Sequence, residues 1–232
     1  QRQMCIRDRL ILPDLAILDP SLTINLAPNI TASTGIDAMV HAIEAYTSIN
    51  PNNNPISKML SIEALKFLGS SIKTAVFEGH NINARSNMLF GSMLAGKAFA
   101  NSPVAAVHAL AYPIGGLFNI SHGLSNSLVL PSVMKFNSIN EETKKNYANL
   151  APYVFKDLDN SKSDEIVCNN FIDSLESLSK ELKLPYRLRD LEIPEEACQL
   201  MASEAMKQTR LLVNNPRKIE ESDAFNIYKS VW

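Results

Sequence analysis

The sequence predicts an all-α protein with one leftover strand at its N-terminal side. Three observations support this fold class. Apolar residues recur at helical spacing through most of the chain. Clusters of proline and asparagine separate the periodic segments. One short apolar run near the N-terminus is typical of a buried strand but has no evident partner strand downstream, so we interpret it as the last strand of a sheet outside this sequence.

The N-terminal part is expected to divide into two segments. Residues 1–9 are polar and aperiodic, so we interpret them as a non-family or artefactual segment. Residues 10–30 contain the strand, bracketed by Pro13 and Pro20, and a linker. An α-helical domain is expected over residues 31–232.

The first helix is expected to follow Thr31, Ser33 and Thr34, which are candidate N-caps. Its apolar face is formed by Ile36, Met39, Val40 and Ile43. The stretch NPNNNP at residues 50–55 is expected to end this helix, because proline cannot continue a helix and asparagine favours turns.

Two further helices are expected at residues 57–76 and 83–99. The second is rich in alanine, glycine and methionine, so neighbouring helices could approach it closely, and we expect it to be fully buried. Residues 101–122 are less regular. A helix at residues 125–136 is expected to bend at Pro131.

Beyond a polar hinge, amphipathic helices are expected to alternate with proline breaks. The pattern is clearest at residues 164–182, which carry an apolar stripe with a charged back. Pro194 is expected to open a helix over residues 195–212, and Pro216 precedes a last helix that ends at Trp232.

Composition excludes several classes of partner. Apolar residues make up 46% of the 232 residues and the net charge is −2, which is typical of a soluble globular protein and attracts neither nucleic acid nor an anionic membrane. The 3 cysteines form no CxxC pair, so a disulfide framework or a cysteine zinc site is not expected. No apolar run has the length of a membrane span. We therefore expect a cytoplasmic protein.

Three of the four histidines lie in segments of low charge density. Asp37 and His41 are four residues apart on an expected helix, so both side chains project from one face, one turn apart. His108 lies in an apolar segment, and His122 lies at an expected helix entrance. A buried histidine usually just forms hydrogen bonds. A carboxylate on an apolar helix face, however, needs a cation or strong donors to offset the desolvation of its charge, which favours a metal site.

Two other polar residues, Glu44 and His80, are candidates for a role at such a site. Glu44 follows His41 closely and could support a metal ligand, but a solvated glutamate on a helix face is the commoner case. His80 lies in a polar turn, where a chemical role is not expected.

Two long motifs resemble those of the iron-containing alcohol dehydrogenases. Residues 31–46, TASTGIDAMVHAIEAY, are similar to the first motif, and residues 108–116, HALAYPIGG, running to HGLSN at 122–126, are similar to the second. Residues 87–96 and the NPR at 215–217 also resemble this family. The resemblance implies the helical C-terminal domain of the dehydroquinate synthase-like fold. By position it implies four metal ligands: Asp37, His41, His108 and His122.

The resemblance also implies a function, an NAD(P)-dependent alcohol dehydrogenase that interconverts a small alcohol and an aldehyde or ketone. Three imidazoles and one carboxylate leave a divalent ion with a net charge of about +1 and open positions for a substrate oxygen. Such an ion acts as a Lewis acid in hydride transfer to or from a nicotinamide. The resemblance favours Fe2+ as the cofactor, and Zn2+ is its competitor.

Four further residues take their expected roles from the resemblance. Many family members have a histidine credited with relaying a proton where this chain has Tyr112, which is therefore the candidate catalytic residue, although a phenol is a poor base at neutral pH. Phe99 matches a position that lines the substrate pocket in relatives, although a core aromatic residue on a buried helix is an equally common case. Leu26 and Ile30 are expected to border the dinucleotide through backbone and apolar contacts.

The nucleotide half of the site is expected to be missing. The resemblance implies that residues 10–30 are a remnant strand and linker from a missing nucleotide-binding domain, and that residues 31–232 are an α-helical metal-binding domain. The sequence contains no glycine-rich phosphate-binding turn, and the family binds NAD(P) mostly through an N-terminal α/β domain. We therefore expect a truncated oxidoreductase whose exposed apolar face around residues 15–26 favours self-association into a homo-oligomer. The alternatives are a metal-binding helical fragment without independent activity and a helical interaction module whose histidines are structural.

Overall fold

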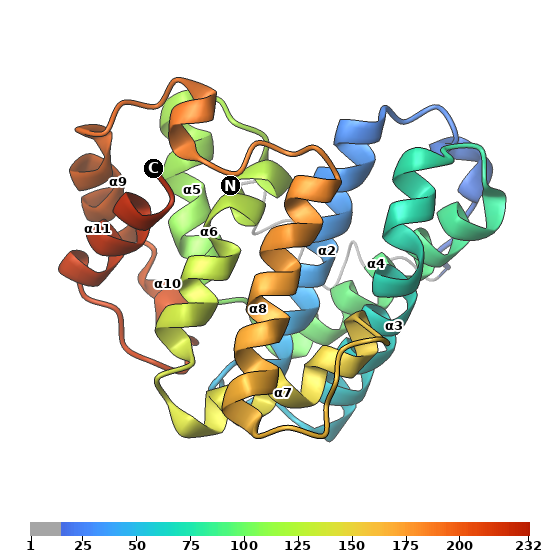
Figure 1. Cartoon of the computed structure of the whole chain (residues 1–232), viewed down its shortest axis with the longest axis horizontal. Coiled ribbons are helices and arrows are strands. Elements are labelled where there is room, and N and C mark those ends of the chain that lie inside the picture. Colours follow the sequence, from blue (N-terminus) through green and yellow to red (C-terminus); the bar gives the residue numbers. More distant parts are fainter. Residues whose placement is uncertain (1–14) are drawn as a thin grey trace.

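The computed structural model describes residues 15–232 (Figure 1). Within that range the chain is helical and contains no β-strand, so the all-α expectation is confirmed. The longer helices are α2 (Pro28–Thr47), α3 (Pro55–Phe77), α4 (Ile82–Asn101), α5 (Ala106–Phe118), α6 (His122–Asn137), α7 (Glu141–Val154) and α8 (Asp164–Glu181). Shorter elements are η2 (Pro20–Thr23), η3 (Leu188–Leu191), α9 (Ala197–Met206), α10 (Thr209–Leu212) and α11 (Glu221–Ser230).

The expected N-terminal strand is not formed over its described part. Residues 15–19 have no regular structure, and the side chains of Leu15 and Ile17 are 75% and 82% exposed. A strand needs a partner for its backbone N–H and C=O groups, and no described segment offers one. The rest of the expected strand, and the segment interpreted as artefactual, lie outside the described residues.

Helix α2 lies at the centre of the fold and contacts α3, α4, α6 and α7 (Figure 1). The helices α5, α6, α9 and α11 pack together on one side of it, and α3 and α4 pack on the other. Helix α2 is buried along most of its length, including Ile36, Met39 and Ile43. Most side chains on α2 beyond its first turn therefore meet other helices rather than solvent.

The start of α2 differs from the expectation. The helix begins at Pro28, and the candidate caps Ser33 and Thr34 lie inside it. Their hydroxyls donate to the carbonyl oxygen of Ile30, at 3.2 and 2.8 Å. Proline suits the first position of a helix because its φ is already helical and its missing N–H would have no partner there. Proline therefore sets this helix start, and no side chain caps it.

The helix α4 is not fully buried as expected, because only one of its faces packs. A Cβ on Gly91 would approach Leu68 Cγ of α3 to 2.8 Å, so this glycine permits the close contact between α3 and α4. A Cβ on Gly96 would meet nothing within 4 Å. Small residues in α4 thus lie on a packed face and on an open one, and composition alone does not distinguish the two.

The segment expected to be irregular before His122 contains the helix α5, with Pro113 inside it. Gly115 and Gly116 lie within this helix, and the chain leaves it at Asn119, which has a φ of 58°. The Tyr228 hydroxyl from α11 donates to the carbonyl oxygen of Leu110 at 2.6 Å. This buried bond holds the proline-containing helix in place.

The C-terminal region follows the expected order with one break. The helix expected over residues 195–212 is divided into α9 and α10, because the backbone leaves helical geometry at Gln208, where ψ is 45°. The last helix, α11, ends at Ser230, before Trp232. Among the described helices, none is long and apolar enough to span a membrane.

Candidate metal centre

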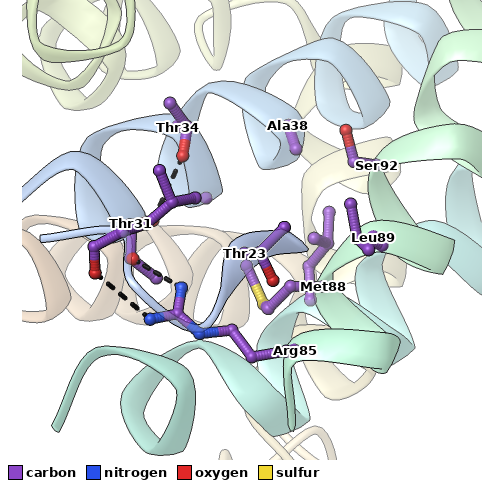
Figure 2. A pocket seen from close by; sticks show the side chains of 11 residues that line it. Thr23, Thr31, Thr34, Ala38, Arg85, Met88, Leu89 and Ser92 are labelled. Atoms are coloured by element: carbon purple, nitrogen blue, oxygen red, sulfur yellow. Dashed lines mark hydrogen bonds between the residues drawn. The ribbon is translucent and has the colours of Figure 1, made fainter. Parts of the chain in front are cut away.

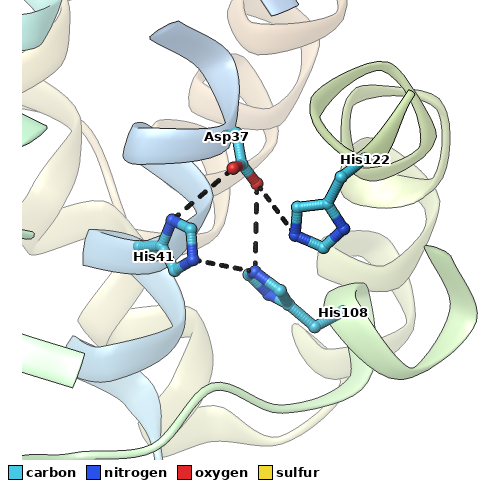
Figure 3. Close-up of side chains that lie close together, drawn as sticks. All are labelled: Asp37, His41, His108 and His122. Carbon is cyan, nitrogen blue, oxygen red and sulfur yellow. Dashed lines mark hydrogen bonds and ion pairs between the residues drawn. The ribbon is translucent and has the colours of Figure 1, made fainter. Parts of the chain in front are cut away.

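Three helices bring the four predicted ligands to one place (Figure 3). Asp37 and His41 project from the same face of α2. His108 lies in the first turn of α5, and His122 is the first residue of α6. We call these four residues the Asp–His cluster. Both helix starts face α2 because α6 packs against α2 and α5 packs against α6.

Asp37 lies between the three histidines of the Asp–His cluster. Its Oδ1 atom is 3.6 Å from Nε2 of His122 and 3.9 Å from Nε2 of His108, and its Oδ2 atom is 3.9 Å from Nδ1 of His41. The Nε2 atoms of His41 and His108 are 3.1 Å apart. One donor atom from each residue lies within 4.8 Å of all the others.

These separations suit a single ion. Donor atoms about 2.1 Å from a tetrahedral ion lie about 3.4 Å from one another. The closest contacts of the Asp–His cluster are already near that value, and no donor pair is more than 4.8 Å apart. Nitrogen and carboxylate oxygen are donors that Fe2+, Zn2+ and Mn2+ all accept. The arrangement therefore fits a divalent metal ion.

The electrostatics of the site keep two imidazoles neutral. Burial and, to a lesser extent, the neighbouring His108 lower the pKa of His41 to about 4, although Asp37 and Glu44 oppose the shift. Burial also lowers the pKa of His122, again opposed by Asp37. A neutral imidazole has the free lone pair that a metal ion requires.

Exposure differs across the Asp–His cluster. The side chain of His108 is 3% exposed, those of Asp37 and His41 are partly covered, and that of His122 is 45% exposed. The site is therefore open on the side of α6 and closed on the side of α5. Solvent therefore reaches the Asp–His cluster at His122.

Two further residues contact the Asp–His cluster: Glu44, whose role sequence reasoning left open, and Asn126, which it missed. Glu44 is buried, and its carboxylate accepts a hydrogen bond from Nδ1 of His108 at 2.7 Å. Asn126 is fully buried, and its Nδ2 lies 2.5 Å from Oδ1 of Asp37 and 3.2 Å from Nε2 of His122. Position could have indicated both, because each polar side chain follows a predicted ligand by one helical turn.

Phe99 and Tyr112 both lie at the edge of the Asp–His cluster. The ring of Phe99, from α4, stacks on His41 with centroids 4.7 Å apart and planes 25° apart. The ring of Tyr112 is 5.9 Å from that of His122. Their expected substrate-binding and catalytic roles are compatible with these positions and stay predictions.

The two predicted cofactor contacts lie elsewhere. Leu26 lines a separate cavity of about 120 Å³ beside the start of α2, together with Thr23, Arg85 and Met88 (Figure 2). Ile30 is 45% exposed and does not line this cavity. No member of the Asp–His cluster lines it, so the cavity is distinct from the candidate metal centre. Dinucleotide binding by either residue stays a prediction.

Arg85 lines that cavity and hydrogen-bonds to the segments around it. Its guanidinium donates to the Thr31 hydroxyl at 2.7 Å and to the carbonyl oxygens of Gly79 and Leu26 at 2.8 and 3.3 Å. It thereby ties the start of α2 to α4. His80, by contrast, lies exposed in a turn outside the Asp–His cluster, as expected.

The family model and the sequence relatives that match this chain agree with one another. Residues 31–232 match the model of the family described as "Fe-containing alcohol dehydrogenase family, C-terminal". The chain is 39% identical over 225 residues to long-chain-alcohol dehydrogenase 1 of Geobacillus thermodenitrificans, covering 96% of this chain and 55% of that protein. It is 34% identical to 1,3-propanediol dehydrogenase of Citrobacter freundii, with coverages of 95% and 56%.

Solved structures agree with these sequence matches. A crystal structure of 1,3-propanediol oxidoreductase matches with a TM-score of 0.88 and 33% identity, covering 95% of this chain and 56% of that one. The alcohol dehydrogenase of Oenococcus oeni matches with a TM-score of 0.86 and 33% identity, with coverages of 92% and 54%. The chain thus spans about half the length of the relatives that it matches.

Proposed function

This chain belongs to the Fe-containing alcohol dehydrogenase family, and from that premise we propose that its Asp–His cluster binds one divalent metal ion, Fe2+, for the NAD(P)-linked interconversion of an alcohol and an aldehyde or ketone. The convergence of one carboxylate and three imidazoles from three helices is the observation that supports this proposal. The relatives named for long-chain alcohols and for 1,3-propanediol support an alcohol or aldehyde as the substrate class.

The chemistry of the proposed site follows from its donors and its exposure. A divalent ion bound there supplies Lewis acidity, which lowers the pKa of an alcohol or polarises a carbonyl. The protein holds the ring of His41 against Phe99, which covers it from the α4 side. The exposed edge at His122 admits the substrate oxygen. Tyr112 lies beside that edge, where its hydroxyl is a candidate hydrogen-bond donor to the reacting oxygen.

We propose that NAD(P) binding requires protein beyond the described residues. Dinucleotides bind where backbone N–H groups converge on the pyrophosphate, usually after a glycine-rich turn. Between residues 15 and 232 no glycine has a positive φ, and Gly115 and Gly116 lie inside a helix. The relatives are nearly twice as long as the matched region, so the 232-residue chain alone is expected to be inactive.

The metal content of two histidine variants tests the proposed site. His41→Ala removes one of four donors and is expected to lose most of the bound metal. His80→Ala is the control, because this exposed histidine lies outside the Asp–His cluster. The proposal predicts metal loss, measured by elemental analysis, in the first variant only. Equal metal content in both variants would contradict the ligand assignment.

The catalytic part of the proposal needs a second measurement. Fusing the chain to the N-terminal half of the Citrobacter 1,3-propanediol dehydrogenase should produce NADH-linked aldehyde reduction that the 232-residue chain alone lacks. A metal-loaded fusion that binds NADH but reduces no aldehyde would instead support the alternative, a metal-binding helical domain without this activity.

A further inference from the structure

Glu44 is a buried carboxylate with an unusual set of partners. It lies on α2, one turn beyond His41, and its residue is 5% exposed. Among the described residues, no lysine or arginine forms an ion pair with it. A buried carboxylate is costly unless strong donors surround it. Its donors therefore indicate its role.

All three donors to Glu44 come from the start of α5. Its Oε1 accepts from the backbone N–H of Val107 at 2.6 Å, and its Oε2 accepts from the N–H of Ala105 at 3.0 Å. These N–H groups have no acceptor inside their own helix, and no side chain of α5 caps them. The third donor is Nδ1 of His108, 2.7 Å from Oε2. Glu44 thus caps α5 and holds its histidine at once.

The contact with Glu44 decides which nitrogen of His108 carries the proton. A carboxylate only accepts hydrogen bonds, so Nδ1 of His108 must be the donor. The proton is then on Nδ1, and the lone pair of the neutral ring is on Nε2. Nε2 is the atom that faces the Asp–His cluster, 3.1 Å from Nε2 of His41 and 3.9 Å from Oδ1 of Asp37 (Figure 3).

We propose that Glu44 is a positioning residue that fixes the tautomer and the direction of His108, so that the Nε2 lone pair points to the metal position. The proposal rests on the metal centre proposed above and adds the residue that prepares one of its ligands. A histidine ligand whose second nitrogen donates to a carboxylate is oriented and made more basic by that bond. Glu44 does so from the same helix that supplies Asp37 and His41.

The surrounding loop also has contacts that do not involve His108, and these provide a matched control. The Ser102 hydroxyl donates to the carbonyl oxygen of Ala45 at 2.6 Å, next to Glu44 on α2. Ser102 is fully buried, as is the contact that it makes. Ser102→Ala therefore removes a contact between α2 and the loop before α5, while the bond between Glu44 and His108 stays intact.

The first test measures the tautomer directly in the metal-free 232-residue protein. Nitrogen-15 NMR of the histidine side chains at mildly alkaline pH distinguishes a protonated from an unprotonated ring nitrogen. The expected result for His108 is a protonated Nδ1 and an unprotonated Nε2. A proton on Nε2 would overturn the proposal, whatever the metal affinity, and no variant is needed for this outcome.

The second test measures Zn2+ affinity by competition with a chromophoric chelator. Glu44→Gln leaves one neutral acceptor oxygen for the three donors, so the bond from Nδ1 of His108 is either lost or changed from a charged to a weaker neutral acceptor, depending on which way the amide points. Mutation of such a partner typically weakens metal binding by about 10–100-fold. Ser102→Ala is expected to bind Zn2+ within about threefold of wild type. An unchanged affinity in Glu44→Gln, or an equal loss in Ser102→Ala, would overturn the positioning role. Wild-type protein that binds no Zn2+ although His108 is protonated on Nδ1 would refute the metal centre instead.

Discussion

Gly123 lies where α6 comes closest to α2, directly after His122. A Cβ on Gly123 would lie 2.4 Å from the carbonyl oxygen of Ser33 and 2.7 Å from its carbonyl carbon. Both are backbone atoms of α2, which cannot rotate away as a side chain can. Gly123→Ala is therefore expected to push the start of α6 away from α2. We expect the shift to be about half an ångström or more, and to move His122 away from Asp37.

The expected cost has two parts. Overpacking of this kind usually destabilises a protein by about 1–3 kcal/mol. Metal–ligand distances tolerate only about 0.2 Å, so the displaced imidazole should also weaken metal binding. Stability is measured by urea denaturation of the metal-free protein, and Zn2+ affinity by chelator competition. Together, the two measurements distinguish a loss of fold stability from a loss of metal affinity.

Gly116→Ala is the matched control. Like Gly123, this glycine lies in a helix and in the second motif, where it falls between His108 and His122. A Cβ on Gly116 would meet nothing within 4 Å. Alanine is the better helix former, so the control should gain up to about 1 kcal/mol and keep its Zn2+ affinity. If Gly123→Ala matched this control in both measurements, the close approach of α6 to α2 described above would be wrong.

Two predictions concern the buried tyrosines. Tyr228→Phe removes the buried hydrogen bond from the Tyr228 hydroxyl to the Leu110 carbonyl oxygen and should cost about 0.5–1.5 kcal/mol in urea denaturation. Tyr186→Phe, at a 46% exposed residue, should cost almost nothing, and equal stabilities would refute the role of this bond. Burial raises the pKa of Tyr147 and Tyr228, so both stay protonated in the folded protein when the tyrosines of the unfolded chain ionise near pH ~10. The unfolded state then binds fewer protons, and the free energy of unfolding should fall as pH rises above that value; a flat profile there would contradict the burial of these hydroxyls.

The sequence alone determined the fold class and most of the helices. Apolar periodicity recovered α3 and α8 to within a few residues, because a helix that buries one face must repeat apolar residues along it. The spacing of Asp37 and His41 placed two side chains on one helical face without further information. The assignment of His108 and His122 to the same site came from the family resemblance, because no local rule connects residues on different helices.

Tertiary structure alone decided how the segments meet. Helix α5 continues through Pro113, and contacts from outside the helix stabilise it: Tyr228 of α11 hydrogen-bonds its Leu110 carbonyl and Glu44 caps its start. Sequence rules take account only of the N–H group that proline lacks, so they predicted an irregular segment. Glu44 could not be distinguished from a solvated glutamate until the start of α5 was placed against α2. The run at residues 15–19 has the pattern of a strand but no described partner, and strand pairing depends on a second segment that a local pattern cannot supply. Local periodicity thus fixes the elements, whereas the contacts between helices fix the site.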